Sequence, residues 1–149
     1  MPESVITTNR KAGFNYELLE RFEAGLALTG SEVKSLRNGR ANLTDAYALI
    51  KGNELWLINC HISEYAPAAF MNHPPRRTRK LLLHRQQIER MTGQLQQKGL
   101  TLIPTKLYWK KGRAKCELAL ARGKKLFDKR ETIKQRETQR EVARALRGK

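Results

Sequence analysis

Histidine and cysteine are the residue types in this chain that could perform nucleophilic catalysis or bind a metal ion, but their spacing suits neither. The three histidines, His61, His73 and His84, form no HExxH pair, and no CxxC motif accompanies them, so a zinc site is not predicted. Cys60 and His61 are adjacent, and adjacent side chains of a strand point to opposite faces, which does not suit a nucleophile and its base. Glycine motifs that bind phosphate are missing. The sequence therefore predicts a protein that is not an enzyme and has no catalytic residue, metal or cofactor.

Basic residues dominate the charge of the chain. Thirty Lys and Arg stand against fourteen Asp and Glu, which gives a formal net charge of +16. A compact chain with this charge repels itself, so we expect a polyanionic partner, either nucleic acid or an anionic membrane surface. The sequence contains no apolar run long enough to span a bilayer and no recognisable secretion signal, so we expect no membrane segment and a cytoplasmic location. Cys60 and Cys116 are then expected to stay reduced.

The last 29 residues, 121–149, carry the highest density of positive charge. They contain eleven basic and four acidic residues, a local charge of +7 (11 − 4), and few apolar side chains. Arg136, Arg140 and Arg144 are spaced i, i+4, so their repulsion weakens a helix in the free chain, and neighbouring phosphates would remove that penalty. We expect a tail that is disordered when free and helical on RNA. A solvated tail that only improves solubility is the alternative.

Turn and cap signals divide the remaining chain into short elements. Thr29 and Glu32 have the spacing of a capping box at the start of a helix. Gly52 and Asn53 suit the turn of a hairpin, and Gly99 follows a second helix whose apolar residues share one face. We expect strands over 16–28, 46–50, 55–60, 80–83, 100–109 and 114–121, helices over 31–38 and 85–98, and a long loop over 63–79.

Many short strands with one helix between two hairpins favour a mainly β fold. We expect a small closed antiparallel β-barrel of the oligonucleotide-binding type with flanking helices, because closure removes exposed strand edges. Phe22, Trp56 and Trp109 are expected to fill the barrel, and Pro104 to mark an edge or a bulge. The expected organisation is a flexible N-terminus over 1–8, a barrel domain over 9–122 and a basic tail over 123–149.

Two tyrosines lie beside basic residues, an arrangement that RNA-binding surfaces use. Tyr16 follows Arg10 and Lys11, and Tyr108 precedes Lys110. Each ring could stack on a nucleobase or lie at the rim of the core, and the sequence supports both readings equally.

Several blocks of the sequence resemble one protein family. Asn9-Arg10-Lys11-Ala12 and the segment 22–37, which contains Gly-Ser-Glu-Val-Lys-Ser-Leu-Arg, resemble the start of SmpB, the SsrA-binding protein family of bacteria. The resemblance continues through 40–43, 45–47, 79–83, 107–110, 121–125 and 128–130. It covers about residues 9 to 149 in order.

The resemblance implies a fold and a role. It implies an oligonucleotide-binding-type barrel with peripheral helices and a C-terminal tail that is unstructured when free. The protein would bind the tRNA-like domain of transfer-messenger RNA and bring it, charged with alanine and together with elongation factor Tu, to stalled ribosomes for trans-translation. Alanyl-tRNA synthetase would be a partner through the RNA, and the tail would enter the vacant mRNA channel at the small-subunit decoding centre. We expect a monomer.

Individual residues are implicated in two RNA surfaces. In the body, the resemblance places RNA contacts at Asn9, Glu23 and Leu82, with Arg10, Lys11 and Lys80 beside them. In the tail, we expect ribosome contacts at Lys124, Lys125, Phe127, Asp128, Lys129, Arg130, Arg136, Arg140 and Arg144. Lysine and arginine suit phosphates. The carboxylate of Glu23 must instead accept from base amino or 2′-hydroxyl groups to offset repulsion by phosphate.

The chain departs from the family pattern at three places. Gly13-Phe14 stands where many members carry Arg-His, Pro74 where Asp is frequent, and Phe127 where Tyr or His is common. Phenylalanine can stack on a base but cannot hydrogen-bond, so a polar role at that position is lost. Two other classes of function stay open: a ribosomal component that binds ribosomal RNA without transfer-messenger RNA, and a metal-independent nuclease.

Overall fold

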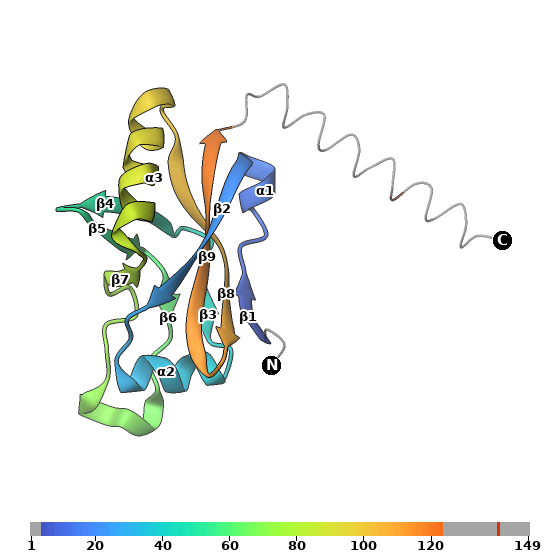
Figure 1. The fold of residues 1–149 in the computed structure, drawn as a ribbon. Coiled ribbons are helices and arrows are strands. Elements are labelled where there is room, and N and C mark those ends of the chain that lie inside the picture. The colour runs from blue at the N-terminus through green and yellow to red at the C-terminus, as the bar shows by residue number, and fades with distance from the viewer. Residues whose placement is uncertain (1–3, 124–139, 141–149) are drawn as a thin grey trace.

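Antiparallel strands are the most abundant elements in the part of the chain that the computed structural model describes, residues 4–123 and residue 140 (Figure 1). Within these residues, seven strands join in the order β1-β8-β4-β5-β7-β2-β9. Strand β9 also pairs with β8, so the pairings return to β8. The strands of this sheet are β1 (Ser4–Thr8), β2 (Tyr16–Leu26), β4 (Tyr47–Lys51), β5 (Glu54–Ile58), β7 (Arg79–Leu82), β8 (Thr101–Lys110) and β9 (Arg113–Gly123).

Short helices flank the sheet. Helix α1 (Ala12–Asn15) precedes β2, α2 (Gly30–Arg37) follows it, and α3 (Arg85–Lys98) connects β7 to β8. The capping box predicted for α2 is present, since the Thr29 side chain accepts from the Glu32 backbone N–H and the Glu32 side chain accepts from Thr29 N–H. Gly99 ends α3 in the left-handed conformation, with φ of 60°. Both predicted helices are therefore confirmed to within one residue.

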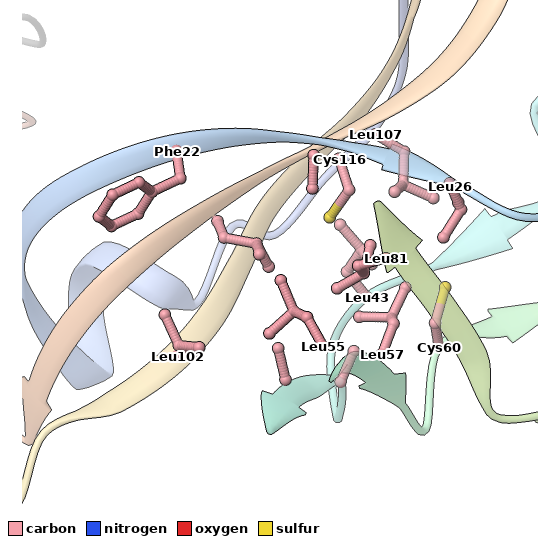
Figure 2. Packing of buried hydrophobic residues seen from close by; sticks show 14 of the residues in the cluster. Phe22, Leu26, Leu43, Leu55, Leu57, Cys60, Leu81, Leu102, Leu107 and Cys116 are labelled. Carbon is pink, nitrogen blue, oxygen red and sulfur yellow. The ribbon is translucent and has the colours of Figure 1, made fainter. Parts of the chain in front are cut away.

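The side chains that point inward from the strands form one hydrophobic core. Figure 2 shows side chains from β2, β5, β7, β8 and β9 pointing toward one another. In β2, β5 and β9 the core residues alternate along the strand, as the period-two pattern requires, whereas the register shift next to Pro104 interrupts the alternation in β8. Among the core residues with at most 8% exposure are Phe22, Leu26, Leu43, Leu55, Leu57, Leu81, Leu102, Leu107, Leu118 and Leu120. Phe22 lies in this core as predicted, whereas Trp109 is only partly buried and packs against it.

Both predicted hairpins are confirmed. Gly52 and Asn53 adopt φ values of 62° and 61° between β4 and β5, the left-handed conformation that this turn needs. The second hairpin joins β8 to β9 through Lys111 and Gly112, which also have positive φ. The pairing of β8 with β9 shifts register next to Pro104, so the bulge expected there is present.

The structure differs from what the sequence led us to expect at three places. Residues 4–8, expected to belong to a flexible N-terminus, form strand β1, in which Val5 pairs with Tyr108 of β8. Trp56 does not fill the core: Leu55 and Leu57 point inward, so Trp56 points outward, where its indole N–H donates to Lys51 O. The segments β3 (Ala41–Asn42) and β6 (His61–Ile62) form a separate two-stranded sheet that was not predicted.

The long loop after β6 is held against α2 by buried polar contacts. It contains a 3₁₀ helix, η1 (Ala66–Met71), and ends at β7. Glu32 and Arg79 are both fully buried and form an ion pair, and Arg77 Nη2 lies 2.6 Å from Glu32 Oε1. Burial alone would raise the pKa of Glu32, but hydrogen bonds from Arg77 and from Thr29 N–H, with the charge of Arg79, outweigh it and lower the pKa to about 2. Glu32 is therefore an ionised anchor for the loop.

Candidate nucleic-acid interface

Glu23 lies on the outer face of β2 and is held by two residues of β8. Tyr108 donates its hydroxyl to Glu23 Oε2 at 2.7 Å, and Lys110 Nζ lies 3.2 Å from the same oxygen and 3.4 Å from Oε1. The hydrogen bond from Tyr108, aided by Lys110 and by the charge of Lys115, lowers the pKa of Glu23 although partial burial opposes them. The site therefore presents an ionised carboxylate in a fixed orientation. A carboxylate of this kind is an acceptor for amino and hydroxyl donors.

Leu82 lies next to Glu23 in a shallow hollow. Leu82 pairs with Gly25 across β7 and β2, and its side chain is 51% exposed while that of Leu81 points into the core. A Cβ at Gly25 would lie 3.3 Å from Leu82 Cβ, so the glycine lets the leucine lie close to the strand. Glu23, Gly25, Leu82 and Lys115 line one hollow together with the start of α3. We call this hollow the Glu23 site.

The Glu23 site combines three kinds of contact. Its carboxylate accepts hydrogen bonds, Leu82 offers an exposed apolar surface, and Lys115 supplies positive charge. A splayed base presents a flat apolar face and polar edges, and it is attached to a phosphate. The arrangement therefore suits an unpaired nucleotide better than a purely apolar ligand.

Lys80 shares the outward face of β7 with Leu82. It lies two residues before Leu82, and its Nζ is 3.2 Å from Glu54 Oε1 in a half-exposed ion pair. An ion pair at this exposure is weak, about 0–1 kcal/mol, so a phosphate can compete with Glu54 for the ammonium group. Lys80 therefore lies two residues from Leu82 on the same face of β7, but it does not line the Glu23 site itself.

Asn9 and Lys11 lie in a different hollow. They line it with Tyr16, Tyr47 and Thr101, none of which lines the Glu23 site. The side-chain amide of Asn9 donates to Pro104 O at 3.0 Å, and its backbone N–H donates to Thr105 O at 2.7 Å. The amide therefore fixes the start of α1 onto β8, which the sequence did not suggest. Arg10 and Lys11 beside it are exposed.

The two tyrosines have different places. Tyr108 is only 2% exposed, so its ring does not form an open stacking surface, and its hydroxyl serves Glu23 instead. Tyr16 is half-buried against a small cluster of Ala12, Ile103 and Ala121. The sequence drew attention to Tyr108 through the basic and aromatic residues around it, but it did not indicate that Glu23 is its partner.

The predicted tail residues lie almost entirely outside the described residues. Arg140 is described and is exposed in a helical conformation. Lys124, Lys125, Phe127, Asp128, Lys129, Arg130, Arg136 and Arg144 lie outside the described residues.

The cysteines and histidines have structural surroundings in the described part of the chain. Cys60 and Cys116 are free and buried, and burial raises the pKa of Cys60 to about 11 and that of Cys116 still further. His61 lies in β6, as predicted for a strand residue. His73 is buried, and its ring nitrogens bond to Ser31 Oγ and Ile62 O. Within residues 4–123 and 140, no group of acidic, cysteine or histidine side chains could hold a metal ion, and no helix is long and apolar enough to cross a membrane.

The described residues form a small, basic, mainly β protein. An ordered carboxylate, an exposed apolar side chain and several cations lie side by side on its surface. This combination is the surface chemistry of RNA-binding proteins. Residues 6–148 match the family model described as SmpB protein. The chain therefore belongs to the SmpB family.

Proteins described as SsrA-binding protein are similar to nearly the whole chain. The one from Trichodesmium erythraeum (strain IMS101) is 54% identical over 97% of this chain and 94% of its own length. The one from Gloeothece citriformis (strain PCC 7424) is 58% identical over 96% of this chain and 93% of its own length. A chain of the solved structure "tmRNA-SmpB: a journey to the center of the bacterial ribosome" is 49% identical, with a TM-score of 0.68 over 80% of this chain and 85% of that chain. The mainly β fold is thus similar to that of a solved SmpB chain.

Proposed function

We propose that this protein is a non-catalytic adaptor that binds the tRNA-like domain of transfer-messenger RNA and delivers it to stalled ribosomes for trans-translation. The Glu23 site carries the proposal, because it offers a splayed nucleotide an acceptor, an apolar contact and a cation in one hollow. Membership of the SmpB family and the names of the relatives support the choice of RNA. Elongation factor Tu and alanyl-tRNA synthetase are expected to reach the protein through this RNA.

Each body residue has a proposed role that follows from its surroundings. Glu23 accepts a hydrogen bond from a base amino or 2′-hydroxyl group, and Lys110 and Lys115 offset its repulsion of nearby phosphates. Leu82 packs on a base, and Lys80 binds a phosphate. At the second hollow, Lys11 and the neighbouring exposed Arg10 bind phosphates, while Asn9 positions them by fixing the start of α1.

The finer organisation is part of the same proposal. The strand pairings that return from β9 to β8 support a small closed barrel of the oligonucleotide-binding type over residues 9–122, with β1 added at its edge. The basic segment 123–149 would be disordered when free and would enter the mRNA channel near the decoding centre as a helix. Its charge of +6 (10 − 4) supports an RNA surface as the partner of this segment. The protein would act as a monomer in the cytoplasm.

The test is the binding of a transcript of the tRNA-like domain by Glu23→Ala. We expect a loss of about tenfold or more with an unchanged fold, because an ionised, hydrogen-bonded contact is worth about 1.5–3 kcal/mol. Glu17→Ala is the matched control, since Glu17 lies on the same strand, is exposed and pairs with Arg122. Equal affinities of both variants and the wild type would reject Glu23 as a contact. No measurable binding by the wild type would reject the proposed function itself.

A further inference from the structure

The end of the molecule formed by α2 and the loop that contains η1 carries a surface that the Glu23 site does not include. Figure 1 shows α2 and this loop side by side at one end, with α3 toward the other end. Lys34 Nζ of α2 lies 5.6 Å from the ring centre of Tyr65, the residue that precedes η1. We call this surface the α2–η1 surface.

Two apolar side chains protrude from the α2–η1 surface. Phe70 is 93% exposed and Met71 is 73% exposed, more than any other large hydrophobic side chain among the described residues. The backbone beneath them is closed by reciprocal hydrogen bonds, in which Asn72 Oδ1 accepts from Tyr65 N–H at 2.9 Å and Asn72 Nδ2 donates to Tyr65 O at 2.7 Å. The chain therefore holds an aromatic ring in solvent on a turn that has its own internal bonds.

The turn is also anchored to the body of the protein. His73, the next residue after Asn72, bonds to Ser31 Oγ of α2 at 2.8 Å and to Ile62 O at 3.0 Å. Arg77 and Arg79 bind the buried carboxylate of Glu32. An anchored loop loses less conformational entropy when a partner binds to it, which is an advantage for a contact surface.

The charge of α2 and of the loop that contains η1 identifies the chemistry of the partner. Lys34 and Arg37 of α2, Arg40 shortly after it and Arg76 of the loop are all exposed. Glu32 is buried and already occupied by Arg77 and Arg79, so Glu64 is the one exposed carboxylate of 30–40 and 63–79. An exposed aromatic ring on a surface whose exposed charges are almost all positive suits a base-stacking contact with phosphates bound beside it.

The α2–η1 surface adjoins the Glu23 site. Val33 of α2 and Leu82 line one further hollow together with Trp109 and Arg113. An RNA bound at Leu82 can therefore also contact α2, because both line the same hollow. We propose that the α2–η1 surface is a second contact for the same structured RNA, in which Phe70 stacks on an unpaired base and Lys34, Arg37 and Arg76 bind phosphates. This inference rests on the proposed function.

Charge reversal on α2 tests the phosphate contacts in the full-length protein. The probe is a transcript of the tRNA-like domain, with affinities measured over a range of salt concentrations. For Lys34→Glu/Arg37→Glu we expect a loss of roughly tenfold or more and a salt slope smaller by about 1–2, because each lost phosphate contact removes about one released counterion. Lys51→Glu/Arg90→Glu is the control with the same change of charge, at the end of β4 and within α3, where both side chains are exposed and neither lines the Glu23 site. Equal losses in the two double variants would overturn the proposal.

Substitution of Phe70 tests stacking separately from charge. Phe70→Ala and Phe70→Leu should both weaken binding by about 5- to 100-fold, and Phe70→Trp should retain it, because stacking needs a π surface. Wild-type affinity of Phe70→Leu would overturn the stacking role, since leucine keeps the apolar surface without the ring. Self-association of the wild type that is lost in Phe70→Ala would assign the surface to a second copy of the chain and overturn the proposal. Suppose that the wild type binds the RNA, that Glu23→Ala binds it more weakly, and that the α2 and Phe70 variants bind it like the wild type. The proposed function then stands, and the proposal for the α2–η1 surface is wrong.

Discussion

Tyr108 and Glu23 are joined by a 2.7 Å hydrogen bond that spans a whole strand. Glu23 lies on β2 and Tyr108 on β8, and β9 pairs with both of them. The tyrosine is 2% exposed, whereas the carboxylate reaches solvent, so a buried side chain orients an exposed one. Lys106 Nζ lies 5.0 Å from the ring centre of Tyr108. The proposed RNA contact at Glu23 is thus held in place by residues that the RNA need not touch.

The first prediction concerns Tyr108→Phe. Loss of the hydroxyl removes the largest influence that lowers the pKa of Glu23, so this pKa should rise toward its ordinary value of 4.5. The affinity for the tRNA-like domain should fall, by less than roughly tenfold, because the carboxylate loses its fixed orientation. The pKa is measured by a carbon NMR titration of the Glu23 carboxylate.

A double-mutant cycle separates positioning from structure. If Tyr108 acts through Glu23, Tyr108→Phe should cause no further loss of affinity in the Glu23→Ala background. Losses that add fully in the double variant would show that Tyr108 acts independently of the carboxylate.

The second prediction concerns the buried ion pair of Glu32 and Arg79. Glu32→Gln leaves the fully buried guanidinium of Arg79 without its counter-charge, so we expect a loss of about 3–5 kcal/mol in the free energy of unfolding. Glu54→Gln breaks the half-exposed pair with Lys80 and should cost about 0–1 kcal/mol. Urea unfolding at neutral pH measures both. Similar small losses in the two variants would contradict the anchoring role of Glu32.

The same carboxylate makes stability depend on pH. The pKa of Glu32 is about 2 in the folded protein and 4.5 as its ordinary value, so the unfolded chain binds the proton more tightly. Its contribution to stability is complete above about pH 5 and is lost as the pH falls from 4.5 toward 2. The difference between the unfolding free energies of the wild type and Glu32→Gln should therefore shrink over this range. If the difference between the two unfolding free energies stays constant on acidification, the partners of Glu32 do not lower its pKa.

The third prediction concerns Gly25→Ala in the Glu23 site. The added Cβ would lie 3.3 Å from Leu82 Cβ, so the half-exposed leucine must move by a few tenths of an ångström. Because Leu82 can move toward solvent, stability should change by less than about 1 kcal/mol. RNA affinity should fall several-fold, since the apolar surface next to Glu23 is displaced. If Leu82 is shifted in Gly25→Ala but the RNA affinity equals that of the wild type, Leu82 is not a contact for the RNA.

The fourth prediction separates the body from the basic tail. A chain truncated before Asp128 should keep its affinity for the tRNA-like domain, because the body residues proposed to bind it lie before that point. Tagging of peptides on stalled ribosomes should be abolished, because the tail contacts from Asp128 onward are removed. The two quantities are measured by RNA binding and by tagging in a reconstituted translation system. Equal loss of both would contradict separate roles for the two parts.

Local signals in the sequence were sufficient for most of the elements. The capping box of Thr29 and Glu32, the hairpin turn at Gly52 and Asn53 and the helix end at Gly99 depend on residues close together in the chain. For this reason both helices and both hairpins could be predicted. Trp56 was misplaced because its strand has apolar residues on both faces, so alternation alone did not say which face turns inward.

Contacts between distant residues could not be predicted in the same way. Strand β1 finds its hydrogen-bond partners in β8, about a hundred residues away, and this short run at the start of the chain gave no signal of that pairing. The same holds for the bond from Tyr108 to Glu23, 85 residues apart, and for the burial of Arg79 beside Glu32. The resemblance to SmpB pointed to Glu23 and Leu82 as contacts, and only the fold places them in one hollow with Lys115.

The central claim is that this protein selects transfer-messenger RNA, and the RNA that co-purifies with it from cells tests this most directly. Sequencing of that RNA should show transfer-messenger RNA as the dominant species, reduced in a Glu23→Ala preparation and retained in Glu17→Ala. A preparation that contains ribosomal RNA fragments in place of transfer-messenger RNA, with no change in Glu23→Ala, would contradict the account.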